Sequence, residues 1–157
     1  MTYQISGWAS TPEADRVGHV VAAGAFDASI RQKGLTGPDG VRLLAFHDAR
    51  LPLGRIRKLE TKPKGLWMEA DIDDRISYAK DLIAAVEAAG GLNFSVGFYP
   101  LDVDLIGDEQ LVITRGELEE VSVVTFPANK GARMEEYKRK ALREAEAAAA
   151  RLKEIFA

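Results

Sequence analysis

Short runs of β-branched or alternating apolar residues, each ended by a turn signal, occupy most of the first 127 residues of this chain. The most hydrophobic run covers residues 118–126 and ends at Pro127, because proline cannot donate a hydrogen bond within a central strand. About seven strands are expected, over residues 1–22, 41–47, 53–60, 66–72, 92–101, 111–113 and 118–126. This pattern predicts an α+β, mainly β fold, in which a closed or nearly closed antiparallel β-barrel has flanking helices.

Two helices are predicted between the strands, a short one near residues 24–34 and a longer one over residues 75–89. In the longer segment, apolar residues recur at spacings of 3, 4 and 3, which is typical of one helix face. Gly90 stands where a C-terminal cap belongs. These apolar positions are Ile76, Ala79, Ile83 and Val86.

The C-terminal segment differs in character from the rest. Residues 133–156 contain no Gly or Pro, and their composition predicts a long helix of about 36 Å at 1.5 Å per residue. Its apolar stripe either packs along its own domain or docks on a partner chain. We therefore divide the chain into a main domain over 1–130 and an assembly or dimerisation element over 131–157. The stripe consists of Met134, Tyr137, Ala141, Ala145, Ala148, Leu152 and Ile155.

Composition excludes several kinds of chemistry. The chain of 157 residues, about one domain in length, has no cysteine, which removes disulfides, thiolate metal sites and cysteine nucleophiles. Its two histidines, His19 and His47, are too far apart for the usual zinc motifs, so a zinc site is not expected. A net charge of −3 argues mildly against nucleic acid or an anionic membrane as a partner. No apolar stretch or secretory signal indicates membrane insertion or export.

Two residues stand out as candidates for chemistry. His47 follows an apolar run, and if that run stays extended the imidazole shares a face with Leu43 and Ala45. It is then either a structural side chain or a reactive one. Ser95 lies on the less apolar face of its strand beside Gly97, which has no side chain to block an approaching backbone. The surrounding residues do not form a Gly-x-Ser-x-Gly motif, so a nucleophile elbow is not indicated.

Carboxylates provide the other candidates. Glu119 and Glu120 begin an apolar strand, where each needs either solvent or a buried partner. Glu120 shares its face with Ser122. His19 is the only other imidazole that could serve a catalytic triad.

Six short motifs, in this order and spacing, together resemble the tailed-phage prohead protease family. The resemblance extends from about Gly7 to Asn129, and its last motif, which ends Thr-x-Pro-Ala-Asn, is the most distinctive. The motifs are Gly-Ala-Phe at 24–26, Leu-Leu-Ala-Phe-His-Asp at 43–48, Leu-Gly-Arg at 53–55, Gly-Leu at 65–66, Phe-Ser-Val-Gly-Phe at 94–98 and the run 118–129.

This resemblance implies a serine endopeptidase that matures the viral capsid, with a fold similar to that of the herpesvirus assembly proteases. It implies that His47 is the general base and Ser95 the nucleophile. The family's Leu-x-Glu-Val-Ser pattern places the third catalytic role on Glu120, with Glu119 and His19 as the alternatives. His19 departs from the family, whose members often carry an acidic residue in that segment.

The resemblance implies no metal and no other cofactor, but it does imply partners and a location. Expected substrates are the scaffold protein or the scaffold-like segment of the major capsid protein, inside the immature capsid in the host cytoplasm, and family members also tend to cut themselves. Self-association through the last helix is expected. Two other functions stay open: a non-catalytic capsid assembly or scaffolding protein with the same fold, and an esterase or amidase of small substrates.

Overall fold

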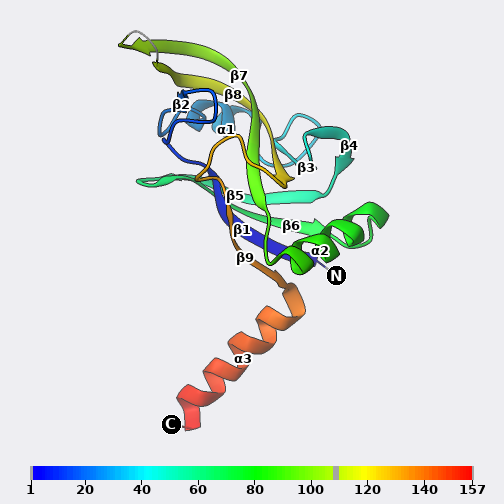
Figure 1. The fold of residues 1–157 in the computed structure, drawn as a ribbon. Coiled ribbons are helices and arrows are strands. Elements are labelled where there is room, and N and C mark those ends of the chain that lie inside the picture. The colour runs from blue at the N-terminus through cyan, green and yellow to red at the C-terminus, as the bar shows by residue number, and fades with distance from the viewer. Residues whose placement is uncertain (1, 108–109, 157) are drawn as a thin grey trace.

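Nine strands and three helices account for the regular structure of residues 2–107 and 110–156, the part of the chain that the computed structural model describes (Figure 1). The helices are α1 (Asp27–Lys33), α2 (Ser77–Ala89) and α3 (Lys140–Phe156). The strands are β1 (Thr2–Ser10), β2 (His19–Val21), β3 (Arg42–Ala45), β4 (Asp48–Pro52), β5 (Gly54–Lys62), β6 (Gly65–Asp73), β7 (Asn93–Ile106), β8 (Gln110–Val124) and β9 (Met134–Arg139).

The strands form two sheets. The first is antiparallel and has the order β5-β6-β1-β9. In the second sheet, β8 is the central strand. Strand β7 pairs antiparallel with β8 along its length, while β2 and β3 pair in parallel with two separate parts of β8. Strand β4 pairs antiparallel with β3, on the side away from β8. The structure therefore places segments that are distant in sequence on both sides of one long strand.

The α+β, strand-rich class is confirmed, but the prediction of a closed antiparallel barrel is wrong. A barrel needs its edge strands to pair with each other. Among the described residues, an isolated bridge joins Asn93 to Arg133, but neither sheet closes on itself. The parallel pairs of β8 also contradict an all-antiparallel arrangement. Sequence alternation shows which face of a strand is buried, but it does not show which strands pair or in which direction.

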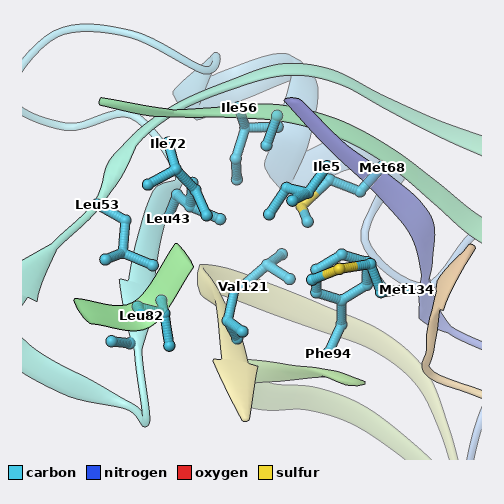
Figure 2. Close-up of a cluster of buried hydrophobic side chains, with 14 of the residues drawn as sticks. Ile5, Leu43, Leu53, Ile56, Met68, Ile72, Leu82, Phe94, Val121 and Met134 are labelled. Carbon is cyan, nitrogen blue, oxygen red and sulfur yellow. The ribbon is translucent and has the colours of Figure 1, made fainter. Parts of the chain in front are cut away.

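The core lies between the sheets and α2, and Figure 2 shows a cluster of its side chains. Ile5 and Met68 from the first sheet are buried together with Phe94 and Val121 from the second. Burial of each such side chain contributes about 1.5–3 kcal/mol. The stripe predicted for residues 75–89 is confirmed where α2 buries Ala79, Ile83 and Val86, and Gly90 ends this helix in the left-handed conformation, with φ of 73°.

The C-terminal helix is shorter than predicted. Met134–Arg139 forms β9 and pairs with the edge of β1, so the helix begins only at Lys140. Pairing satisfies the backbone groups of both strands and buries Met134, which outweighs the helical propensity of this segment. Beyond β9, α3 extends away from the sheets (Figure 1). Its apolar side chains Leu152 and Ile155 are exposed, so this part of the stripe is not packed along the protein's own domain.

No helix within the described ranges is long and apolar enough to cross a membrane.

Alkaline stability tests the burial of Tyr3, which is 2% exposed. Burial and the neighbouring Glu87 carboxylate raise the pKa of Tyr3 to about 12. Because an unfolded phenol has a pKa of about 10, the stability that the neutral Tyr3 contributes is present below pH 10 and lost as the pH rises toward 12. Between these values, Tyr3→Phe should lose free energy of unfolding less steeply than wild type, by about 1.4 kcal/mol per pH unit. Urea unfolding at stepped pH measures this difference.

The control is Tyr99→Phe, whose ring is exposed and whose unfolding curve should follow that of wild type. Parallel pH dependences for wild type and Tyr3→Phe would contradict the expectation.

Candidate active site

The site begins with a tight turn between β3 and β4. The strand predicted over residues 41–47 ends at Ala45, which pairs with Asp48. Phe46 and His47 form the two-residue turn between them, with φ of 54° and 57°. Positive φ at both positions is typical of a type I′ hairpin. His47 therefore projects from a turn. The alternating pattern predicted that His47 shares a strand face with Ala45, and this prediction is wrong.

This turn is strained, because type I′ turns favour Asn and Gly and a left-handed conformation costs other residues about 1–2 kcal/mol each. Strand β8 holds the turn in place. The backbone N–H of Phe46 donates to the carbonyl oxygen of Val123 at 3.0 Å, and that of His47 donates to Oγ of Ser122, also at 3.0 Å. Strained backbone held by its surroundings is common at functional sites.

The His47 imidazole contacts a buried carboxylate. Its Nδ1 lies against Oε1 of Glu120, which is only 8% exposed. The other carboxylate oxygen, Oε2, accepts a hydrogen bond of 2.6 Å from Oγ of Ser122. Both oxygens of Glu120 thus have partners. With Nδ1 directed at the carboxylate, Nε2 is the nitrogen that is left to act on another group.

Strand β7 places Ser95 on the face of the second sheet that carries Glu120. In the antiparallel pairing of β7 with β8, Ser95 is opposite Ser122 and Gly97 is opposite Glu120. Directly opposed residues project to the same side of a sheet, so Ser95 lies on the face that carries Ser122 and Glu120. Ser95 itself is 6% exposed.

Gly97 makes room for the glutamate. A Cβ at this position would overlap Oε1 of Glu120 and lie 2.9 Å from its Cδ. The sequence suggested that an approaching backbone would use this space, but the Glu120 side chain fills it. A β-bulge lies next to it, since Gly97 pairs with Glu120 and Phe98 with Leu118, which leaves Glu119 as the extra residue.

The two alternatives to Glu120, Glu119 and His19, lie at different places relative to His47. Glu119 lies at the edge of the same open pocket as His47, but its carboxylate binds Nζ of Lys33 at 2.6 Å. His19 pairs with Leu111 at the far part of β8, nine residues from Glu120, or about 30 Å along the strand.

The pocket beside His47 has mixed character. Arg42 and Glu119 provide opposite charges at its lining, and Leu44 and Tyr99 provide apolar surface. Ser95 is not among its lining residues. Asp48, next to His47, forms an ion pair with Arg50, and the hydrogen bonds from this arginine lower the pKa of Asp48 to about 2. Asp48 is thus a charged neighbour of the site with a partner of its own.

Two residues with defined roles in this region were not singled out from the sequence. Ser122 bridges His47 and Glu120, and the signal for it was present, because the alternating pattern places it on the Glu120 face. Asn129, the last residue of the distinctive motif, holds the loop after β1. Its Nδ2 donates to the carbonyl oxygen of Thr11 at 2.6 Å, and its Oδ1 accepts from Oγ1 of Thr11 at 2.8 Å. This asparagine is therefore structural.

Within the described part of the chain, no group of three or more acidic or histidine side chains could hold a metal ion.

Comparison with protein families gives a match. Residues 2–147 match the family described as caudovirus prohead serine protease. The chain belongs to this family. The prohead protease of Escherichia phage T5 is 32% identical over 128 residues, which cover 80% of this chain and 59% of the phage T5 protein. The chain thus spans less than two thirds of the length of this relative.

A solved structure shows the same fold at low identity. KSHV protease, in complex with a hexapeptide phosphonate inhibitor, superposes with a TM-score of 0.54 at 10% identity, over 90% of this chain and 67% of the other. This prohead protease family member therefore has a herpesvirus protease-like fold, as the sequence resemblance implied.

The strain in the β3–β4 turn predicts that glycine is more stable than alanine at position 46. Phe46 is 52% exposed, and Phe46→Gly and Phe46→Ala both lose the same half-buried ring. Glycine adopts positive φ freely, so it avoids about 1–2 kcal/mol of strain, which is reduced by about 0.5–1 kcal/mol of extra backbone entropy that glycine loses on folding. The free energy of unfolding in urea should therefore be about 0.5–1 kcal/mol higher for Phe46→Gly than for Phe46→Ala. Ala49→Gly, in exposed β4 with ordinary φ, should lower it relative to wild type, and a lower stability of Phe46→Gly than of Phe46→Ala would contradict a strained turn.

Proposed function

We propose that this chain is a serine endopeptidase of prohead maturation, with Ser95 as nucleophile, His47 as general base and Glu120 as the residue that orients the imidazole. The observation that carries the proposal is the contact of His47 Nδ1 with the buried Glu120, on the sheet face that also carries Ser95. Membership of the prohead serine protease family supports the same assignment.

The chemistry follows the general logic of serine hydrolases. Oγ of Ser95 attacks the scissile carbonyl while Nε2 of His47 takes its proton. The imidazolium then gives this proton to the leaving amine, and an acyl group stays on Ser95. Water, deprotonated by the same imidazole, attacks the acyl carbon, and the imidazolium returns the proton to Oγ of Ser95 as the acyl group leaves as a carboxylic acid. Glu120 stabilises the imidazolium throughout without itself taking the proton.

The proposed substrates are the scaffold protein or the scaffold-like segment of the major capsid protein, inside the immature capsid in the host cell. The phage T5 relative, a prohead protease, supports this choice. We propose that residues 131–157 are an assembly element. The helix α3, which lies in this segment, has exposed Leu152, Ile155 and Phe156, and these apolar side chains favour self-association through α3. A chain that stays monomeric at high concentration would contradict that part of the proposal.

Replacement of the nucleophile provides the first test. Wild type and Ser95→Ala are each co-expressed with the capsid protein of the same virus, and intact masses are measured. Cleavage should occur with wild type and be lost in Ser95→Ala, whereas Ser6→Ala, at a buried serine of β1, should cleave normally. Equal cleavage by wild type and Ser95→Ala would exclude Ser95 as the nucleophile.

The same co-expression, together with fluorophosphonate labelling of the purified protein, separates the alternatives. A non-catalytic assembly protein would leave the capsid protein uncut in every sample, including assembled proheads, and Ser95→Ala would keep its role in assembly. An esterase or amidase of small substrates would react with a fluorophosphonate at Ser95 but would also leave the capsid protein uncut.

A matched pair of glutamate variants tests the third role. Glu120→Gln keeps the size of the side chain but loses the charge that stabilises the imidazolium, so kcat/KM on a capsid-derived peptide should fall by about 10²–10⁴. Glu119→Gln removes the neighbouring charge, which faces Lys33, and should leave kcat/KM close to wild type. The reverse order of effects would assign the role to Glu119.

A further inference from the structure

Ser122 lies on β8 next to all three candidate catalytic residues. Its side chain is fully buried, and its Oγ is 3.0 Å from the backbone nitrogen of His47 and 2.6 Å from Oε2 of Glu120. Across the sheet it is directly opposite Ser95. One hydroxyl group therefore contacts the turn that carries the imidazole and the carboxylate that the imidazole binds.

The directions of these two hydrogen bonds are determined by chemistry. A backbone N–H can only donate, so Oγ of Ser122 accepts from His47. The single hydroxyl hydrogen is then available for Glu120, whose ionised carboxylate can only accept. A hydroxyl is thus suited to this position, because it accepts from one partner and donates to the other at the same time.

The orientation of Glu120 depends on this arrangement. With Oε2 held by Ser122, Oε1 is the oxygen presented to Nδ1 of His47. Gly97 leaves the space that this side-chain conformation needs. A carboxylate fixed against Nδ1 keeps the proton of a neutral imidazole on that nitrogen and leaves the lone pair on Nε2.

We propose that Ser122 is a positioning residue, which holds the Glu120 carboxylate and the His47 turn so that the imidazole keeps its proton on Nδ1 and presents Nε2 toward Ser95. This inference deepens the proposed peptidase function and, in its consequence for Ser95, rests on it. The part that concerns the imidazole tautomer does not require that the protein cleave anything.

Ser29 supplies a matched control for the loss of a buried hydroxyl. Its Oγ accepts a hydrogen bond of 2.9 Å from the backbone N–H of Leu118, on the same strand β8, and the residue is 7% exposed. Ser29→Ala and Ser122→Ala each remove a buried hydroxyl that binds a backbone amide. Of these two serines, Ser122 alone binds the Glu120 carboxylate.

The tautomer of His47 is the first measurement. The chain has only two histidines, so imidazole ¹⁵N labelling with a His19→Gln background reports on His47 alone. At a pH where the imidazole is neutral, long-range ¹H–¹⁵N correlation should show the Nδ1–H form in wild type and in Ser29→Ala. In Ser122→Ala the signal should shift toward a mixture of both tautomers. An unchanged tautomer in Ser122→Ala would overturn the proposal.

The second measurement is the rate at which a fluorophosphonate labels Ser95. Ser122→Ala should lower this rate by about 10–100-fold, Ser29→Ala should leave it unchanged, and Ser122→Thr, which retains the hydroxyl, should restore most of it. If the threonine variant fails to fold, the tautomer in Ser122→Ala decides. If wild type is labelled, an equal labelling rate in Ser122→Ala would overturn the positioning role. A tautomer shift without labelling of wild type would support that role and contradict the peptidase function.

Discussion

The parallel pairing of β3 with β8 is the interaction on which the site depends. It runs from Arg42 opposite Glu120 to Ala45 opposite Val123, and the β3–β4 turn follows at once. The length of this pairing determines where along β8 the chain turns, and the turn places His47 against Glu120. A strand one residue longer would carry the imidazole past the carboxylate, because each strand residue advances about 3.3 Å.

Strand β8 has the same importance on its other edge. Pairing with β7 brings Ser95 opposite Ser122, so segments that are far apart in sequence meet near the C-terminal end of β8. Since β8 is paired on both sides here, its backbone groups have partners and its side chains are fixed in direction. A rigid strand is a suitable support for a site whose groups must lie within hydrogen-bonding distance of one another.

The site contains several features that oppose stability and are offset locally. A carboxylate at 8% exposure is costly unless it has partners, and Glu120 has them on both oxygens. Two left-handed residues, Phe46 and His47, persist because β8 accepts a hydrogen bond from each of their amides. Such a combination is more readily explained by a functional requirement than by stability alone.

Much of the local structure was readable from the sequence. The apolar spacing of residues 75–89 with Gly90 predicted α2 and its cap. The face shared by Glu120 and Ser122 was likewise correct, as their hydrogen bond indicates. These features depend on period and on single residues, which a sequence displays directly.

Other features were missed for identifiable reasons. The turn at Phe46 and His47 has none of the Gly or Asn that normally indicates a type I′ hairpin, so the strand was extended too far. Residues 134–139 have helical composition but complete the edge of β1, and a pairing partner more than 120 residues away leaves no local signal. The closed barrel was predicted from strand number, which does not determine strand order.

The sequence by itself determined the strand-rich class, the positions of α2 and the buried faces, and through its ordered motifs the membership of the prohead protease family. Only the tertiary structure decided that Glu120, and neither Glu119 nor His19, contacts His47, and that Ser122 connects them. The physical reason is that side-chain direction follows from local alternation, whereas proximity follows from the register between strands. That register is set by the summed pairing and packing of the whole sheet.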